Sequence, residues 1–256
     1  MKFSKIVLAV ATFSMAGGAM AHGYVSQPAS RAFMCNANMG AQNKDCGSGP
    51  LYEMQSVEGS DGYPELNKGP EDGHIASAGV ASMSRLDEQT ETRWAKHPIT
   101  AGLHDFSWTY TAPHKTKAWD YYITKADWNP NQPLTRASFE ATPFCHIEGN
   151  NRQPGAGADQ PHECNVPSRE GYHVILAAWD VSDTAATFYN VIDVDFGGHN
   201  SPDEDEGPQA VVSPQWHNDS VYVADDKVQW DGKEYQARWW TKGNQPGKHE
   251  VWALVK

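Results

Sequence analysis

Histidine is the residue type in this chain whose placement could support metal chemistry, and His22 stands at the most informative position. Upstream of it lie a short basic start, a brief apolar run and the small-x-small exit Ala19-Met20-Ala21. This order is typical of a secretory leader, and the apolar run is shorter than the roughly 20 residues that span a bilayer. We therefore expect residues 1–21 to be a signal peptide, cleavage to leave His22 as the first residue, and the mature protein to be secreted and extracellular.

An N-terminal histidine carries two nitrogen donors on one residue. Its free α-amine and the ring nitrogen nearest the backbone can chelate one metal ion, and an imidazole from elsewhere in the chain would complete a three-nitrogen, T-shaped site. All-nitrogen tetragonal coordination favours Cu(II), which also heads the affinity order of the divalent first-row metals. The site cannot exist before cleavage, because the His22 nitrogen is then an amide.

The sequence offers several partners for His22 among its 11 histidines. His114 is preferred because it lies in "TAPHKTKAW", a tight turn between two expected strands, and a rigid turn holds a ligand still. His74, His104 and His162 remain alternatives for the second imidazole.

The segments that must position these histidines have the patterns of β-strands. Residues 104–112 ("HDFSWTYTA") alternate aromatic with polar side chains, residues 117–125 follow after a short connection, and residues 172–181 and 187–196 are apolar runs typical of buried strands. No long segment has helical periodicity. With abundant Gly and Pro, these runs predict a mainly β protein built as a β-sandwich.

The stretch between Cys35 and Ile99 departs from this pattern. It is mostly polar and Gly-rich, with room for short helices. It predicts a long helical-loop insert. Long irregular segments of compact domains are usually functional, and a tolerated surface loop is the alternative.

Four cysteines indicate disulfide bonds, because the count is even and the expected compartment is oxidising. Two of them lie close together near the start of the chain and two near residues 145–164. Local pairing therefore predicts Cys35–Cys46 and Cys145–Cys164. The chain has no C-x-x-C pair, so a zinc site is disfavoured.

The last quarter of the chain is predicted to be a separate small unit. Residues 197–213 contain Gly, Pro and an acidic cluster and have the composition of a linker. Residues 214–256 recover short alternating strands with seven Trp or Tyr residues and no cysteine, so aromatic packing must hold this β module together. Strict alternation would send Trp239 and Trp240 to opposite faces, unless the strand bulges or ends before "TKG".

The formal net charge of −12 disfavours nucleic acids and anionic membranes as partners. It is compatible with a neutral polysaccharide, which aromatic stacking and hydrogen bonds would bind. No second apolar stretch is long enough for a membrane helix, so we expect a released protein without membrane partners.

Several motifs resemble the bacterial chitin-active lytic polysaccharide monooxygenases, formerly called type-4 chitin-binding proteins. They are "HGYVSQPASRA", "YEMQSVEG", "GPEDGHIASA", "TRW", "TAPHKTKAW", "PLTRASFEATPFC" and "VILAAWDVSDTAATFYNVIDV", and they span residues 22–196. The resemblance implies an immunoglobulin- or fibronectin-like β-sandwich with one copper ion in a histidine brace. His22 is then the chelating ligand and His114 the second imidazole.

The resemblance also implies roles around the copper. Phe188 matches the aromatic residue at one axial position, Ala112 the small residue that crowds the other, and Glu58 the acidic residue that reaches toward the oxygen co-substrate.

A flat face around the copper binds crystalline chitin in such proteins. The matching positions are Tyr52, Glu53, Thr111 and Asp183, with Tyr52 as a stacking platform. Met54, Pro113 and Ala186 depart from the proline, arginine and asparagine of some relatives, which affects fine substrate contacts rather than the copper.

The C-terminal segment resembles the type-3 chitin-binding modules through "DDKVQWDGKEYQARWWTKGNQPG" and the closing "VWALV". This resemblance implies that Trp239 and Trp240 stack on sugar rings.

Together these features predict a monomeric copper monooxygenase. It would cleave glycosidic bonds in chitin at C1, using an external electron donor and oxygen or hydrogen peroxide. The alternatives are a non-catalytic chitin-binding adhesin or colonisation factor, and a glycoside hydrolase, which needs two carboxylates flanking a cleft that the sequence does not mark.

Overall fold

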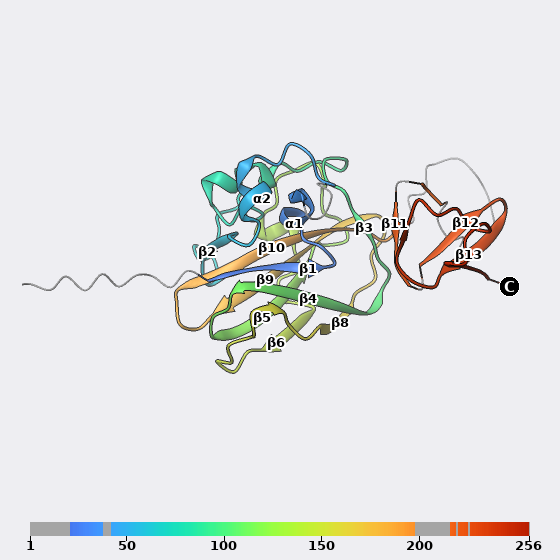
Figure 1. Cartoon of the computed structure of the whole chain (residues 1–256). Helices are drawn as coiled ribbons and strands as arrows, with labels where there is room; N and C mark the ends of the chain where they lie inside the picture. Colours follow the sequence, from blue (N-terminus) through green and yellow to red (C-terminus); the bar gives the residue numbers. More distant parts are fainter. Residues whose placement is uncertain (1–20, 38–41, 198–215, 219, 225, 256) are drawn as a thin grey trace, which may run out of the picture. The chain divides into compact units, whose positions relative to one another are not determined.

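The structure is a computed structural model of the whole chain, and it describes residues 21–37, 42–197, 216–218, 220–224 and 226–255 (Figure 1). Contacts divide the chain into two units, residues 1–199 and 200–256, and each is described by itself. The expected signal peptide up to residue 20, and the expected linker from residue 198, lie outside the described residues. Within the described part, no helix is both long and apolar enough to cross a membrane.

The larger unit contains a four-stranded antiparallel sheet in which β4 is the common partner. Its strands are β1 (His22–Gln27), β4 (Gly102–Ala112), β7 (Gly157–Ala158) and β8 (His162–Val166). Strand β1 runs along one edge of β4, and β7 and β8 pair with β4 at separate positions.

A second, six-stranded sheet carries the most buried strands of the unit. Its path runs β2 (Glu58–Ser60), β10 (Ala186–Asp195), β9 (Tyr172–Val181), β5 (Thr116–Ile123) and β6 (Cys145–Glu148), and β3 (His97–Pro98) pairs with β10. All pairings are antiparallel except β3 with β10.

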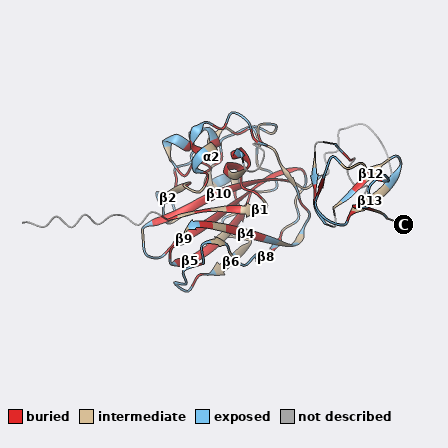
Figure 2. Ribbon diagram, in the orientation of Figure 1, coloured by how far each residue is buried: buried red, intermediate tan, exposed pale blue. Residues whose placement is uncertain are grey.

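Both faces of the second sheet are covered, which explains why β9 and β10 are continuous apolar runs. In β9, Ile175, Ala177 and Trp179 belong to the core between the sheets, whereas Val174 and Leu176 belong to a second core. Figure 2 shows both strands as almost wholly buried. Alternating side chains thus enter two cores, because each face of a strand is occupied by every second residue.

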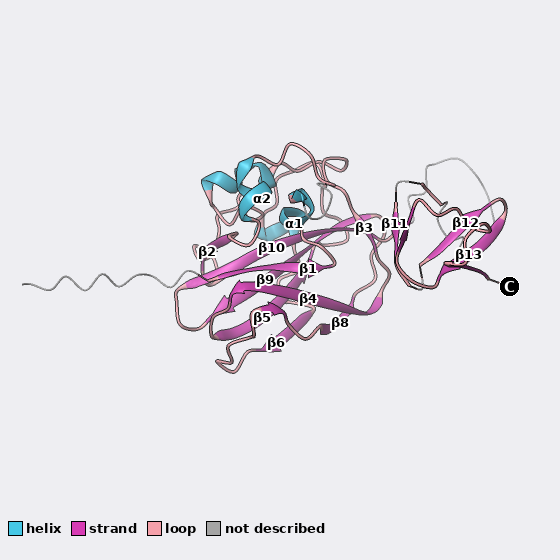
Figure 3. Ribbon diagram, viewed as in Figure 1, coloured by secondary structure: helices cyan, strands magenta, loops and turns pink. Residues whose placement is uncertain are grey.

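The second core is closed by the predicted insert. Its short helices, α2 (Ser48–Glu53) and the 3-10 helix η2 (Ala81–Asp87), gather on one side of the strands (Figure 3) together with α1 (Arg31–Cys35), which precedes the insert. A further 3-10 turn, η3 (Arg136–Ser138), follows β5. The expected mainly β sandwich with a helical-loop insert is therefore confirmed.

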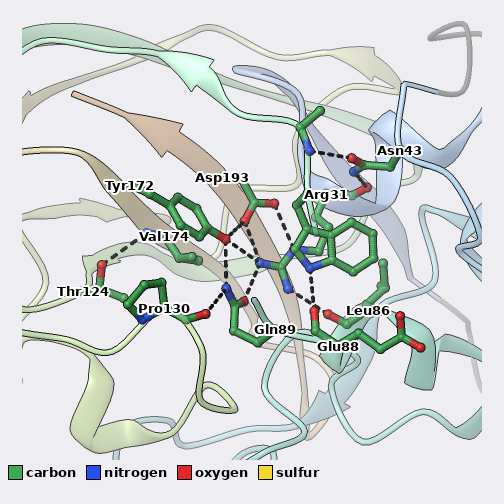
Figure 4. Close-up of polar contacts among 12 residues, drawn as sticks. Arg31, Asn43, Leu86, Glu88, Gln89, Thr124, Pro130, Tyr172, Val174 and Asp193 are labelled. Atoms are coloured by element: carbon green, nitrogen blue, oxygen red, sulfur yellow. Dashed lines mark hydrogen bonds and ion pairs between the residues drawn. The ribbon is translucent and has the colours of Figure 1, made fainter. Parts of the chain in front are cut away.

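A buried ion pair ties this insert to the sheet (Figure 4). The Arg31 guanidinium, fully buried, donates from Nε to Asp193 Oδ2 at 2.9 Å and from Nη2 to Asp193 Oδ1 at 2.6 Å. It also donates to the Leu86 carbonyl at 2.7 Å and to Gln89 Oε1 at 2.9 Å. The Tyr172 hydroxyl donates to Asp193 Oδ1 at 2.6 Å. One guanidinium therefore links α1, the end of η2 and strand β10.

The two predicted disulfides are both present. Cys35 is bonded to Cys46 and Cys145 to Cys164. The first closes a loop within the insert. The second joins β6 of one sheet to β8 of the other, so it fastens the two layers of the sandwich.

The smaller unit is a set of short strands around an aromatic core. One pair is β11 (Val221–Tyr222) with β14 (Thr241–Lys242), and a three-stranded sheet runs β12 (Lys227–Trp230), β13 (Lys233–Ala237) and β15 (Trp252–Leu254). Trp216, Tyr222 and Trp252 are buried together. Asp231 and Gly232 have φ of 50° and 70°, which suits the tight hairpin turn between β12 and β13.

Candidate metal centre

The register of β1 on β4 brings His22 to the turn that carries His114. His22 opens β1 and pairs with Ala112, the last residue of β4. The chain then passes through Pro113 to His114 and enters β5 at Thr116. The two preferred histidines, 92 positions apart in the numbering (22 and 114), are thus gathered at one end of the sandwich.

Glu58 lies at the same place. It opens β2 and pairs with Phe188 of β10. Burial raises the pKa of the Glu58 carboxyl above its usual value, and the positive charges of His22 and His114 act in the opposite direction. Glu58 is therefore within electrostatic range of both histidines.

His114 is oriented by Asp183. Its ring is largely buried, with 9% of the residue exposed, and Nδ1 lies 3.0 Å from Asp183 Oδ1. Desolvation works against ionisation of this carboxyl, but the hydrogen bond from His114 and its charge hold the pKa of Asp183 below its usual value. A carboxylate oxygen accepts, so Nδ1 is the donor in this contact, and the neutral form of the ring keeps the Nε2 lone pair free. A metal-binding histidine needs this arrangement.

Two further residues shape the surroundings of the histidine pair. Phe188 is fully buried and stacks on Trp179 with ring centroids 4.8 Å apart. Ala112 is half-buried and pairs with His22 across the two strands.

The four residues expected on a flat binding face are all exposed. Tyr52 and Glu53 end helix α2, Thr111 precedes the end of β4, and Asp183 lies between β9 and β10. Tyr52 has 71% of its surface exposed, which suits a stacking platform.

Helix α2 is joined to the histidine end of β1 by a main-chain hydrogen bond. The Gly23 N–H donates to the Gln55 carbonyl at 3.1 Å. The Gln55 side chain donates in turn to Glu53 Oε2 at 2.6 Å. These contacts place the α2 residues of the proposed face next to His22.

The alternative histidines have other partners. His162 is buried, with Nδ1 2.7 Å from the Tyr121 hydroxyl, and burial lowers the pKa of its ring to about 4. His104 Nε2 lies 2.8 Å from the Thr100 carbonyl. His74 pairs with Asp87 at 3.1 Å. None of these contacts joins the His22 end of β1.

A metal at this centre needs a main-chain donor. Among the described residues, no three His, Cys, Asp or Glu side chains come together as potential ligands. His22 and His114 supply two imidazoles, and the free α-amine of a processed His22 would supply the third nitrogen. This all-nitrogen donor set fits copper.

The sequence comparisons identify a family with this architecture. The sequence profile described as "Lytic polysaccharide mono-oxygenase, cellulose-degrading" matches residues 22–194. The chain belongs to the lytic polysaccharide mono-oxygenase family. Residues 215–253 match carbohydrate-binding module family 5/12.

Named relatives and solved structures agree with this membership. GlcNAc-binding protein A of Vibrio vulnificus (strain YJ016) is 54% identical over 216 residues, which cover 81% of this chain and 44% of that protein. The chain thus spans less than half the length of this curated relative.

Two solved structures match the larger unit. An AA10 mono-oxygenase from Photorhabdus luminescens is 48% identical with a TM-score of 0.65, covering 69% of this chain and 99% of that one. A Bacillus amyloliquefaciens CBM33 protein, solved in complex with Cu(I) after photoreduction, is 43% identical with a TM-score of 0.60, covering 68% and 99%. The family relationship therefore extends to a protein that binds copper.

Trp239 and Trp240 of the smaller unit are both exposed, at 49% and 62%. Strand β13 ends at Ala237, so the rule of alternating faces no longer applies when the chain reaches the pair. The early end of the strand, one of the two geometries the sequence allowed, leaves both indoles accessible.

Sequence reasoning did not single out Thr116 or Trp179 as supports of the histidine pair. Thr116 appeared only in the motif "TAPHKTKAW" and Trp179 only in the expected strand 172–181, and no short motif distinguishes a supporting core residue from an ordinary one. Asp183 was assigned only to the binding face, because its hydrogen bond to His114 spans 69 positions.

Proposed function

We propose that the mature protein is a secreted copper monooxygenase that oxidatively cleaves glycosidic bonds in crystalline chitin. The observation that carries the proposal is the pairing of β1 with β4, which sets His22 beside the turn of His114. Cleavage after Ala21 would free the third nitrogen donor. The protein acts as a monomer and takes electrons from an external donor.

The copper ligands in this proposal are the His22 amine, the His22 ring and Nε2 of His114. When bound, copper supplies the one-electron chemistry by which oxygen or hydrogen peroxide is activated. Asp183 keeps the proton on His114 Nδ1, so that Nε2 stays available. Phe188, fully buried against Trp179, is the aromatic residue proposed to lie beside the copper.

The remaining proposed roles concern substrate. Glu58, whose pKa is raised by burial, holds a proton or a hydrogen bond near the oxygen co-substrate. Ala112 is the small residue proposed to crowd the other side of the copper. The exposed side chains of Tyr52, Glu53, Thr111 and Asp183 lie against the chitin surface, and the hydrogen next to the glycosidic bond at C1 is the one removed.

Chitin is proposed as the substrate because the curated relatives are named for binding GlcNAc, the unit of chitin. The family description mentions cellulose. The substrate assignment therefore needs a direct comparison of the two polysaccharides.

Product analysis tests the proposed reaction. Copper-loaded protein beginning at His22 is incubated with β-chitin and ascorbate, and the soluble products are analysed by mass spectrometry, with crystalline cellulose in parallel. We expect chitin oligosaccharides with aldonic-acid ends, dependent on ascorbate. Unoxidised oligosaccharides would indicate a hydrolase, and retention on chitin without release would indicate an adhesin.

A non-catalytic chitin-binding adhesin or colonisation factor is the second candidate. The names of the curated relatives, which refer to binding, favour it. Binding alone requires neither a free N-terminal histidine nor an imidazole held in one tautomer by a carboxylate. The His114–Asp183 contact therefore favours the enzyme.

The tryptophan pair is expected to strengthen retention on chitin. Stacking of a base on an aromatic ring contributes about 1–3 kcal/mol, and if sugar stacking is comparable, Trp239→Ala/Trp240→Ala should weaken apparent affinity roughly tenfold or more. Tethering two binding units also raises the effective concentration of each at the surface. Depletion isotherms on chitin measure the effect.

Leu254→Ala is the matched control for this pair. Leu254 is an exposed apolar residue of the same unit, at the end of β15. Its removal should leave the isotherm unchanged. Coincident isotherms for the wild type, the control and the double variant would remove the binding role from Trp239 and Trp240.

A further inference from the structure

The two proposed copper-binding histidines belong to different segments, which the β1–β4 pairing brings together and which share supporting side chains beneath them. We propose that Thr116 is a positioning residue, which with the indole of Trp179 locks the His114 turn to the His22 end of β1. The inference rests on the proposed function, because it concerns the geometry of the same copper ligands.

A chain of two hydrogen bonds joins Trp179 to His114. The indole Nε1 of Trp179 donates to Thr116 Oγ1 at 2.7 Å. The Thr116 hydroxyl donates to the His114 carbonyl at 3.3 Å. An indole N–H can only donate, so the hydroxyl accepts from it and directs its own proton to the carbonyl. Because Thr116 and Trp179 are both fully buried, water does not compete for these bonds.

The same indole also supports the segment that carries His22, through the neighbouring residue Gly23. A Cβ placed on Gly23 would lie 2.9 Å from Trp179 Cζ3 and 2.9 Å from Tyr110 Cδ1. Real side chains do not approach so closely, so the backbone next to His22 rests directly on these rings. Any side chain at this position would lift the start of β1 away from them.

Trp179 is itself held from several directions. Its ring stacks on Phe188 at 4.8 Å and meets Tyr110 edge-on at 4.7 Å. One rigid indole therefore contacts the His22 arm through Gly23, the His114 arm through Thr116, and Phe188. The indole thus separates and supports the His22 segment and the His114 turn, and we call it the spacer. Among the described contacts, the Thr116 hydroxyl is the only group that links this indole to the His114 turn by hydrogen bonds.

The main chain of Thr116 is anchored independently of its hydroxyl. Its N–H donates to the Arg152 carbonyl at 2.9 Å, and its carbonyl accepts from the Asn151 N–H at 2.9 Å. Thr116→Val should therefore keep the strand in place while removing the joint. Thr116→Ser restores the hydroxyl and is the conservative rescue.

The test measures copper binding and spectroscopy on protein that begins at His22. We expect Thr116→Val to bind Cu(II) roughly tenfold more weakly in titration calorimetry, the lower end of the effect of losing an outer-shell partner. The EPR spectrum of the bound Cu(II) should shift, and Thr116→Ser should restore both. A merely structural role would lower Tm and leave affinity and spectrum unchanged, and that result overturns the proposal.

Gly23→Ala probes the spacer from its other side and keeps the proposal testable if Thr116→Val does not fold. Its control is Gly155→Ala, because a Cβ at Gly155 meets no atom within 4 Å. Gly23→Ala should weaken Cu(II) binding and alter the EPR spectrum, whereas the control should do neither. Equal affinities in folded Gly23→Ala and Gly155→Ala proteins would overturn the role of the spacer.

The copper titrations distinguish a failure of the positioning role from a failure of the proposed function. Failure of the wild type to bind Cu(II) would remove the copper site itself. Tight binding by the wild type with unchanged Thr116→Val and Gly23→Ala variants would remove only the positioning role.

Discussion

Protein that retains Ala21 ahead of His22 is expected to lose tight copper binding and oxidative activity. One additional residue converts the α-amine into an amide, which removes the main-chain donor and breaks the chelate with the His22 ring. The loss should exceed the roughly 10- to 100-fold drop caused by removing an outer-shell partner, because a direct ligand is removed. Titration calorimetry with Cu(II) compares the two forms, and product analysis on chitin follows.

The extended form should fold normally, so its Tm in the absence of copper is the internal control. The Ala21 side chain is already buried against the core between the sheets in the unprocessed chain, and the β1–β4 pairing begins only at His22. Equal copper affinity in both forms would contradict the brace.

The strands were predictable because each imposes a local pattern on its own residues. The run over residues 104–112 falls within β4, that over 172–181 coincides with β9, and that over 187–196 lies one residue from β10. The disulfides were predictable for a similar reason, since each pair is close in sequence.

The pairings between strands distant in the sequence were not predictable from these patterns. Pairing of β1 with β4 joins residues 80–90 positions apart, and nothing in the alternation of either strand records the register. Short β2, which delivers Glu58, has only three residues and no periodicity to detect. The expected leader and the turn of "TAPHKTKAW" already favoured His22 with His114, with other histidines left open, whereas Glu58 was assigned only through the family resemblance.

The tryptophan pair shows how a local rule fails at the end of an element. Alternation assumes a continuing strand, and β13 stops at Ala237. Arg31 shows a different failure. Arginine is a residue type usually found on the surface. Arg31 can be buried because its acidic partner Asp193, 162 positions away in the sequence, pairs with its charge.

Arg31→Met is expected to destabilise the larger unit by about 3–5 kcal/mol, because it leaves the Asp193 carboxylate buried without its ion-pair partner. At roughly 2–4 °C per kcal/mol for a domain of this size, Tm should fall by about 6–20 °C. The effect should be large because the guanidinium also satisfies the Leu86 carbonyl and Gln89. Chemical denaturation followed by near-UV circular dichroism measures the loss.

A matched control is Arg85→Met, in the insert that the Arg31 side chain contacts. Arg85 pairs with Glu88 on the surface of η2, with its side chain more than half exposed. Surface pairs contribute about 0–1 kcal/mol, so this variant should stay close to the wild type. A drop for Arg31→Met no larger than that for Arg85→Met would show that the ion pair does not anchor the insert.

The double variant Arg31→Met/Asp193→Leu separates the cost of an unpaired charge from the loss of attraction. Replacing both members of a buried pair by apolar side chains is often neutral, whereas removing one partner is costly. We therefore expect the double variant to recover much of the stability lost in Arg31→Met, with an interaction energy in the double-mutant cycle that reports the coupling. The recovery should be incomplete, because the Tyr172 hydroxyl loses the carboxylate that accepts its hydrogen bond at 2.6 Å. A double variant less stable than Arg31→Met would mean that the carboxylate is stabilised mainly by Tyr172, and that the guanidinium acts chiefly through its contacts with η2 and Gln89.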